Sequence, residues 1–470
     1  MQYKLVSTCG SDRLVLFFAG WAMDAHPFET LRRDGYDVMV VWDYRYFDID
    51  WSCVDSYREI CIIAWSMGVY AADMSTHSIS SRVSKRIAVN GTTSPVHNML
   101  GIPEAVFSGT RKGLTANSLR KFYRRVCGSR EVFAAFSEHL PERDLDELGD
   151  ELDAIWPAPL LTNSPAGSWD LAFISRDDAI FPAVNQWRAW HDRVPVVMTD
   201  GPHYPDIQKI IDRQIVDKQI IAPRFGRGQA TYDSEASVQR EIVDRLFKSA
   251  LAPGLGSTAA TAGAKILEIG CGTGLLSHRI SDIMTPGAYL EMWDVVDSAP
   301  LQGDDRRFRC CDAEIAVRGL VSRSFDLIAS ASTVQWFNSP RRFLAECNRV
   351  LKEGGLLMCS TFVSGNIAEI SSLTGNALPL LSEEQWRMII PAGFEILYFE
   401  SYSRDMAFDS ALDVFRHLKA TGVNALGRSA AGEVSLRPLL ERYQPDLDGR
   451  YHITYRPLIF ILKKKYGTGF

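Results

Sequence analysis

The chain has 470 residues, of which 46% are hydrophobic and 23% charged, a globular composition too long for one ordinary hydrophobic core, so we expect two domains. A formal net charge of −6 argues against a general nucleic-acid-binding protein, and no apolar run approaches the roughly 20 residues of a membrane span. The nine cysteines show no C-x-x-C or Cys/His zinc spacing and the first residues show no secretory signal, so we expect a cytoplasmic protein with reduced thiols and no metal site.

Two apolar strands open the first predicted domain, at residues 13–19 and 59–64. The second strand leads directly into Trp65-Ser66-Met67-Gly68. A serine at a sharp turn from strand to helix, followed by a glycine two residues later, is the layout of a nucleophile elbow. The first glycine of that motif is Ala64 here, at a position that requires only a small side chain. Ser66 is therefore a candidate nucleophile, with an ordinary turn serine as the alternative.

A nucleophilic serine needs a base and an orienting acid, which α/β-hydrolases supply in the chain order Ser, Asp, His. A predicted strand at 171–174 is followed by Asp177 and Asp178, and a predicted strand at 196–198 is followed by His203. We choose His203 as the base. We choose Asp178 as the acid because a proline follows it at the spacing D-x-x-x-P, and Asp177 remains the alternative.

Two further features belong to this predicted hydrolase. The backbone N–H groups of Trp21, in the loop after the first strand, and of Met67 are candidates for the oxyanion hole. Residues 95–161 interrupt the strand rhythm with helical patterns, as a lid would. This segment is basic, which indicates either a solvated helix face or a docking surface for an acidic partner. Its basic residues are Arg111, Lys112, Arg120, Lys121, Arg124, Arg125 and Arg130.

Residues 14–24, 63–72 and 201–205 resemble the BioG family of pimeloyl-ACP methyl ester esterases, where ACP is acyl carrier protein. The similarity runs over residues 1–213. It implies hydrolysis of a methyl ester on an ACP-bound acyl chain, with Ser66, Asp178 and His203 in the triad positions. An acidic carrier would suit Arg120, Lys121, Arg124 and Arg125 of the lid.

Residues 214–223 are polar, helix-like and then broken by a proline, so we predict a linker there and a second domain over 224–470. In that domain residues 265–277 read as a buried strand that breaks into a glycine turn and opens a helix. Leu275 stands where a dinucleotide fingerprint has its third glycine, which disfavours a pyrophosphate cofactor. The turn glycines are Gly270, Gly272 and Gly274.

Acidic residues flank this turn. Glu268 precedes it, and Asp294 ends the next predicted strand, where its carboxylate is placed to accept hydrogen bonds from ribose hydroxyls. This pattern resembles class I S-adenosylmethionine (SAM) methyltransferases. In the following loop Asp312 is placed to accept from the exocyclic amine of adenine, and the backbone at Ala313 to pair with the ring, although a plain surface turn is the alternative.

The opening segment 224–239 resembles BioC, the malonyl-ACP O-methyltransferase family, and residues 325–336 carry a matching Val-Gln-Trp element. The resemblance covers residues 222–464 and implies that Tyr232 and Gln239 lie near the methyl donor. Methylation of a carboxylate moves no proton, so no general base is required.

Together these features predict an α/β protein: an α/β-hydrolase domain with a helical lid (1–213), a linker (214–223) and a Rossmann-like class I SAM methyltransferase domain (224–470). The two resemblances imply a bifunctional enzyme of biotin synthesis that methylates malonyl-ACP and hydrolyses pimeloyl-ACP methyl ester. One alternative is an ACP-binding scaffold whose hydrolase half is inactive. Another is an esterase and methyltransferase pair that acts on a different carboxylate.

Overall fold

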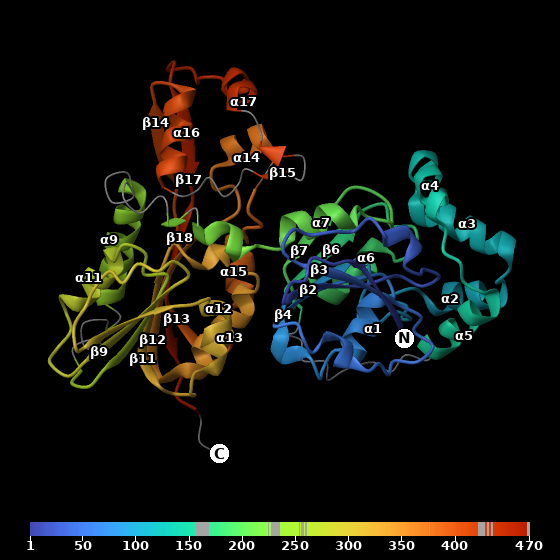
Figure 1. Cartoon of the computed structure of the whole chain (residues 1–470), viewed down its shortest axis with the longest axis horizontal. Coiled ribbons are helices and arrows are strands. Elements are labelled where there is room, and N and C mark those ends of the chain that lie inside the picture. The colour runs from blue at the N-terminus through green and yellow to red at the C-terminus, as the bar shows by residue number, and fades with distance from the viewer. Residues whose placement is uncertain are drawn as a thin grey trace. The chain divides into compact units, whose positions relative to one another are not determined.

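The computed structural model describes residues 1–156, 169–223, 225–226, 236–252, 254, 258, 261–375, 377–421, 428–429, 432–433 and 436–467. The chain forms two compact units, Met1–Ile215 and Val216–Phe470 (Figure 1). Each unit contains its own seven-stranded sheet, and the α/β class predicted from the sequence is confirmed. No helix in the described part of the chain combines the length and hydrophobicity that a membrane span requires.

The sheet of unit 1 has the strand order β1-β3-β2-β4-β5-β6-β7. Only β1 runs antiparallel to its neighbour, and the other pairs are parallel. Strands β2, β4 and β5 are buried along their whole length, which explains why they read as continuous apolar runs. The strands are β1 (Gln2–Ser7), β2 (Arg13–Phe18), β3 (Asp37–Trp42), β4 (Glu59–Trp65), β5 (Val83–Val89), β6 (Leu171–Ser175) and β7 (Val196–Thr199).

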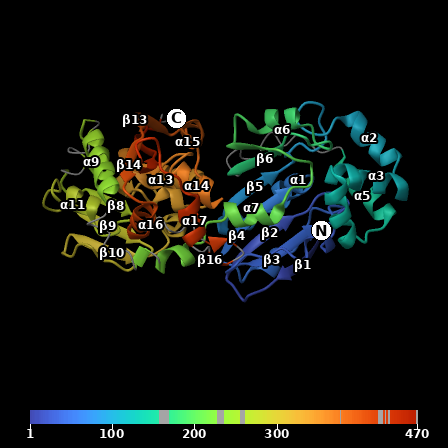
Figure 2. The same ribbon diagram turned by 90° about the horizontal axis from the view of Figure 1, so that it is seen from above.

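Between β5 and β6 the described residues form four α-helices, which lie together at one end of unit 1 and are drawn in cyan and teal (Figures 1 and 2). They are α2 (Glu104–Lys112), α3 (Ala116–Cys127), α4 (Arg130–Phe136) and α5 (Leu145–Ile155). This insertion is the helical interruption that we predicted. The remaining helices of unit 1 are α1 (Gly68–Ser75), α6 (Ala183–Trp190) and α7 (Ile207–Gln214).

The sheet of unit 2 has the order β10-β9-β8-β11-β12-β18-β13, in which β18 is antiparallel to both of its neighbours. This mostly parallel sheet is Rossmann-like, as predicted. Its strands pack on both faces: in β8, Leu267 and Ile269 join one apolar cluster and Ile266 joins another. The strands are β8 (Lys265–Ile269), β9 (Tyr289–Asp294), β10 (Arg306–Cys310), β11 (Phe325–Ala331), β12 (Leu351–Phe362), β13 (Phe394–Ser401) and β18 (Pro457–Lys464).

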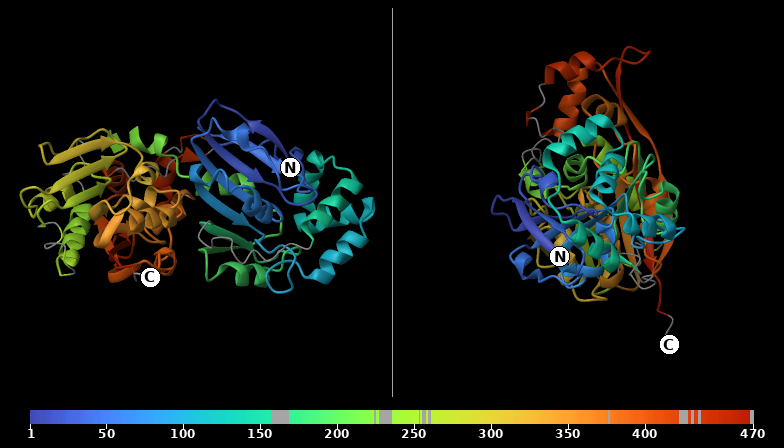
Figure 3. Two further views of the ribbon diagram at one scale, coloured as in Figure 1. Left: turned by 90° about the horizontal axis from the view of Figure 1, so that it is seen from below. Right: turned by 90° about the vertical axis from the view of Figure 1, so that its right-hand side faces the viewer.

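Helices cover this sheet, and a smaller layer projects beyond one end of it (Figure 3, right). The covering helices include α9 (Ser237–Leu251), α11 (Leu275–Ser281), α12 (Ala313–Ala316), α13 (Pro340–Val350) and α15 (Glu383–Ile389). The smaller layer has its own apolar cluster. It contains the ribbon of β14 (Arg404–Phe408) and β17 (Tyr451–Tyr455) with α14 (Ala368–Thr374), α16 (Ala411–Ala420) and α17 (Leu436–Arg442).

The segment 214–223, which we predicted as a helix-like linker, is divided between the two units at Ile215 and Val216. Residues 218–223 are helical. Asn338 anchors the start of this segment, because its amide accepts from the backbone N–H of Val216 at 2.8 Å and donates to the Val216 carbonyl at 3.1 Å. Residues from Val216 onward are therefore part of unit 2 rather than a free connection.

Candidate active sites

In unit 1, Ser66 occupies the turn between β4 and α1 with a φ of 60°, in the left-handed region that L-residues other than glycine rarely adopt. Gly68 permits this sharp turn, because a Cβ atom there would come within 2.5 Å of the backbone oxygens of Phe18 and Ala19. The predicted strand–serine–helix geometry is present, and it presents the hydroxyl at the carboxyl end of the parallel strands.

Three predicted residues meet at this turn. Nε2 of His203 lies 2.9 Å from Oγ of Ser66, and Nδ1 of His203 lies 2.8 Å from Oδ2 of Asp178. Because Nδ1 faces a carboxylate, it carries the proton, and Nε2 is left to accept from the serine hydroxyl. Asp178 is buried, whereas Asp177, the alternative acid, is exposed.

The carboxylate of Asp178 accepts four hydrogen bonds. Its Oδ1 accepts from the backbone N–H groups of Ile180 and Phe181, each at 2.8 Å. Its Oδ2 accepts from His203 and also from the Nε2 amide of Gln186, again at 2.8 Å. Gln186 lies on α6 and is completely buried. Sequence reasoning missed this residue, because no motif spacing marks an orienting amide.

Two side chains that sequence reasoning also missed, those of Trp65 and Asn90, hold the loop that carries His203. Nε1 of Trp65 donates to the His203 carbonyl at 2.8 Å, and Nδ2 of Asn90 donates to the same oxygen at 2.9 Å. The amide of Asn90 also bonds Ser175 in both directions, at 2.8 and 2.9 Å. The ring of Phe181 stacks on the imidazole at a centroid distance of 6.0 Å. These contacts fix the imidazole relative to Ser66.

Trp21 and Met67, the oxyanion-hole candidates, are both buried. Met67 follows Ser66 in the chain, and Trp21 lies in the loop after β2, the strand that pairs with β4. In the part of the chain that the structure describes, neither backbone N–H donates to another residue. The inserted helices hold the Trp21 loop, because the indole of Trp21 donates to the Leu148 carbonyl of α5 at 3.0 Å and the hydroxyl of Tyr123 on α3 donates to the Ala22 carbonyl at 2.9 Å.

The outer face of α3 is basic. Its four predicted contact residues are exposed, whereas Tyr123, Val126 and Cys127 are buried on the opposite face. Elsewhere in the inserted segment, Arg111 pairs with Asp153 at 2.6 Å, but no ion pair to a described residue neutralises the α3 group. The group comprises Arg120, Lys121, Arg124 and Arg125.

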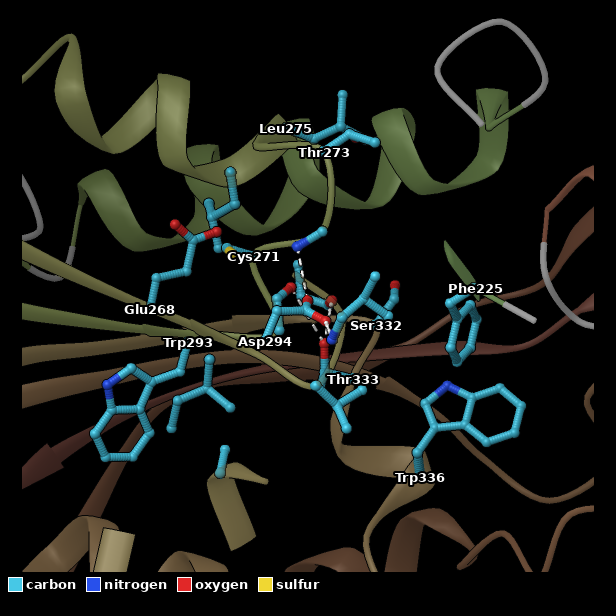
Figure 4. Close-up of a pocket in the computed structure, with 18 of the residues that line it drawn as sticks. Phe225, Glu268, Cys271, Thr273, Leu275, Trp293, Asp294, Ser332, Thr333 and Trp336 are labelled. Carbon is cyan, nitrogen blue, oxygen red and sulfur yellow. Dashed lines mark hydrogen bonds between the residues drawn. The ribbon is translucent and has the colours of Figure 1, made fainter. Parts of the chain in front are cut away.

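In unit 2, a cavity opens where β8, β9 and β11 end at their carboxyl edge. It is bounded by Glu268 and Trp293 on one side and by Phe225 and Trp336 on the other (Figure 4). Six of the eight predicted cofactor residues line it: Glu268, Gly270, Gly272, Asp294, Asp312 and Ala313. Tyr232 lies outside the described residues.

Gly274, the third turn glycine, is not among the residues that line the cavity. It caps α11 with a φ of 96°, and a Cβ atom there would lie 2.8 Å from Pro300. Gly270 is required by close approach instead: a Cβ atom would lie 2.0 Å from Oγ1 of Thr333. Gly272 faces open space, and its N–H donates to Oδ2 of Asp294 at 2.8 Å. The turn is thus shaped by three different constraints.

Two carboxyl groups that line the cavity, those of Glu268 and Asp294, have raised pKa values. Burial raises the pKa of Glu268 to about 7, and its Oε2 atom has no hydrogen-bond partner among the described residues. Burial also raises the pKa of Asp294, against the opposing effect of the backbone N–H groups of Val296 and Gly272. An apolar-walled cavity with two such carboxyls favours a ligand that carries positive charge and hydroxyl donors.

The segment after Val216 forms a wall of this cavity. Lys218, Ile221 and Phe225 line it at positions i, i+3 and i+7, the spacing of one helix face. The rings of Phe225 and Trp336 meet edge to face at 5.3 Å (Figure 4). Sequence reasoning placed Lys218 and Ile221 in the linker, and this spacing is the signal that could have found them. Gln239 of α9 also lines the cavity, and its Oε1 atom has no partner within the described ranges.

The described residues contain no group of three or more His, Cys, Asp or Glu side chains arranged to hold a metal ion. Neither candidate site therefore has a set of protein ligands for one in the part of the chain that is described.

Comparison with known proteins matches each unit to a family. The family described as "Pimeloyl-ACP methyl esterase BioG" matches residues 1–209, and a "Methyltransferase domain" family matches residues 267–359. The solved structure of BioG from Haemophilus influenzae is 34% identical, covers 44% of this chain and 94% of its own, and has a TM-score of 0.40.

Two relatives named malonyl-[acyl-carrier protein] O-methyltransferase are also similar. One, from Haemophilus influenzae, is 33% identical over 257 residues, which cover 53% of this chain and 95% of the relative. The other, from Bacteroides fragilis, is 33% identical over 464 residues, which cover 96% of this chain and 93% of the relative. The chain therefore belongs to the malonyl-[acyl-carrier protein] O-methyltransferase family, as a fusion of an N-terminal BioG domain with a BioC-type methyltransferase domain.

Proposed function

We propose that this chain is a bifunctional enzyme of biotin synthesis. Unit 2 transfers a methyl group from SAM to the free carboxylate of malonyl-ACP, and unit 1 hydrolyses the methyl ester of pimeloyl-ACP. The observation that carries the methyltransferase half is the 33% identity across 96% of the chain to a malonyl-ACP O-methyltransferase. The hydrolase half is supported by the hydrogen-bonded series Ser66–His203–Asp178 within a BioG-matching unit.

The cavity of unit 2 fits SAM as the methyl donor. SAM is cationic at its sulfonium and amino groups, and the buried, unpartnered Oε2 of Glu268 offers a counter-charge. The open space beside Gly272 leaves room for the ligand at the glycine turn. Asp294 would accept from the ribose hydroxyls, and Asp312 from the exocyclic amine of adenine.

When bound, the sulfonium supplies an electrophilic methyl group, so the carboxylate substrate needs no general base. The protein contributes alignment and exclusion of water. Phe225 and Trp336 supply an apolar edge-to-face pair at the cavity wall, which would keep solvent away from an attacking carboxylate. An arginine clamped on that carboxylate would stabilise the ground state and slow the transfer.

For unit 1 we propose an α/β-hydrolase mechanism. Oγ of Ser66 attacks the ester carbonyl while Nε2 of His203 takes its proton, and Asp178 holds the imidazole in the required tautomer. The N–H groups of Trp21 and Met67 would stabilise the oxyanion. As the ester C–O bond breaks, His203 gives this proton to the methoxy oxygen, which leaves as methanol. A water molecule activated by the same base then hydrolyses the acyl-enzyme to the free carboxylate and restores Ser66.

The basic face of α3 is our proposed docking surface for ACP. Four exposed cations without acidic partners among the described residues would attract an acidic carrier and orient its acyl chain toward the lid. The contacts from α3 and α5 to the Trp21 loop would link the docking surface to the oxyanion hole.

The methyltransferase half is tested by incubating the full-length Ser66→Ala variant with malonyl-ACP and SAM and measuring the mass of the carrier. The variant cannot hydrolyse an ester that it forms, so we expect malonyl-ACP to gain the mass of one methyl group. An unmodified carrier, from protein that binds SAM, would contradict malonyl-ACP as the acceptor. Hydrolysis of pimeloyl-ACP methyl ester by the unsubstituted protein, absent in Ser66→Ala, tests the esterase half.

A further inference from the structure

Lys218 connects the wall of the unit 2 cavity to the loop that follows β10. Its Nζ lies 2.7 Å from Oδ1 of Asp312 and 2.6 Å from Oε2 of Glu314. The ammonium also lies over the ring of Phe337, 4.7 Å from the centroid. Although burial alone would lower the pKa of Lys218, the carboxylates of Glu314 and Asp312 raise it above its usual value. Lys218 is therefore a partly buried cation shared by two carboxylates.

Both carboxylates also accept hydrogen bonds from backbone N–H groups. Oε1 of Glu314 accepts from the N–H of Ser339 at 2.5 Å, and Oε2 accepts from the N–H of Asn338 at 3.0 Å. Oδ1 of Asp312 accepts from the N–H of Glu314 at 3.0 Å and so caps α12. Without Lys218, these two acidic groups would face each other with no cation between them, at a cost that burial increases.

The hydrogen bonds of Asp312 are divided unequally. Oδ1 receives both Lys218 and the cap of α12, whereas Oδ2 accepts no hydrogen bond from the residues described here. Asp312 also lines the cavity. Lys218 thus occupies one oxygen of the carboxylate and leaves the other for a donor on the ligand.

We propose that Lys218 is a positioning residue of the methyl-donor site, which holds Asp312 so that its free oxygen receives the exocyclic amine of the adenine ring. This inference rests on the proposed binding of SAM in unit 2. It assigns a cofactor-site role to a residue in the segment that joins the two units, which sequence reasoning treated as a linker.

The test uses the full-length protein and calorimetric titration with S-adenosylhomocysteine, which binds without turnover. Lys218→Met keeps the length of the side chain and removes the charge. We expect its Kd to rise about tenfold or more, because hydrogen bonds to charged groups are lost. Lys218→Arg retains a cation and should stay within a few-fold of the unsubstituted protein. Lys248→Met, at an exposed position on α9, is the matched control and should bind normally.

A second probe separates positioning from general support of the fold. S-inosylhomocysteine lacks the exocyclic amine, so the unsubstituted protein should bind it more weakly than S-adenosylhomocysteine. If Lys218 positions Asp312, the ratio of the two Kd values falls toward one in Lys218→Met. An unchanged Kd, or an equal loss of affinity for both compounds, would overturn the inference. If the unsubstituted protein bound neither compound, the proposed function of unit 2 would fail, and this inference with it.

Discussion

Because the carboxyl group of Glu268 is buried, its ionisation destabilises the folded protein. Its pKa is raised from 4.5 to about 7, so between these values the folded protein binds more protons than the unfolded chain. The contribution of Glu268 to stability is therefore fully present below about pH 4.5 and is lost as the pH rises through about 7. Glu268→Gln keeps the neutral shape at every pH. We expect the ligand-free variant to match the unsubstituted protein near pH 4.5 and to exceed its free energy of unfolding by on the order of 3 kcal/mol above pH 7. Denaturant titrations of both proteins across this range measure the difference, and a constant difference would contradict it.

Gln186 illustrates a second kind of residue, one that acts on the chemistry only through another side chain. Its amide donates to the Asp178 oxygen that also accepts from His203. We expect Gln186→Leu to lower kcat for ester hydrolysis by about 10- to 100-fold with little change in KM, because the acid loses a fixing donor while the substrate contacts remain. Gln186→Glu should be worse, since it places a second carboxyl beside Asp178. A wild-type kcat in Gln186→Leu would show that the four-donor arrangement is redundant.

Helix α3 carries a prediction of its own, because its exposed face concentrates cations that no described acidic residue neutralises. Replacing Arg120, Lys121, Arg124 and Arg125 together by glutamate should raise KM for a carrier-bound methyl ester about tenfold or more and leave hydrolysis of a small methyl ester unchanged. The KM of the unsubstituted protein should also rise with ionic strength, because these charges are exposed to solvent. Lys209→Glu, on the exposed side of α7, supplies one matched charge change away from α3. Equal effects on both esters would show that these α3 residues support the fold of unit 1 rather than the binding of the carrier.

At this scale the limits of sequence reasoning are physical. Strands β2, β4 and β6 were predictable because burial on two faces leaves continuous apolar runs, whereas β1 and β10 are largely exposed and show no such run. Ser66, Asp178 and His203 were predictable because motifs place them at strand ends. The ribbon of β14 and β17 was not predictable, because its pairing joins residues far apart in the sequence, such as Arg404 and Tyr455. Residues 218–223 read as helix-like and are helical, but their place in the cavity wall was missed, because it depends on a distant loop that carries Asp312 and Glu314.

For the whole molecule, the resemblances of the two halves predicted two units with different chemistries, and those chemistries oppose each other. One unit would make a methyl ester and the other would remove one. Unit 1 must then spare the ester of malonyl-ACP and accept that of pimeloyl-ACP, which differ by several methylene groups. Each methylene in an apolar site is worth about 1 to 3 kcal/mol, so an apolar acyl channel is sufficient for strong discrimination.

This selectivity gives the last prediction. With malonyl-ACP and SAM, the unsubstituted full-length protein should accumulate methylated malonyl-ACP as fast as Ser66→Ala does, because the proposed esterase would spare the short ester. The same protein should hydrolyse pimeloyl-ACP methyl ester with a kcat/KM at least about 100-fold above that for malonyl-ACP methyl ester. Time courses of carrier mass follow both reactions in one assay. If Ser66→Ala accumulated much more product than the unsubstituted protein, unit 1 would be hydrolysing the ester that unit 2 forms. Selectivity between the two esters would then need a source other than the length of the acyl chain.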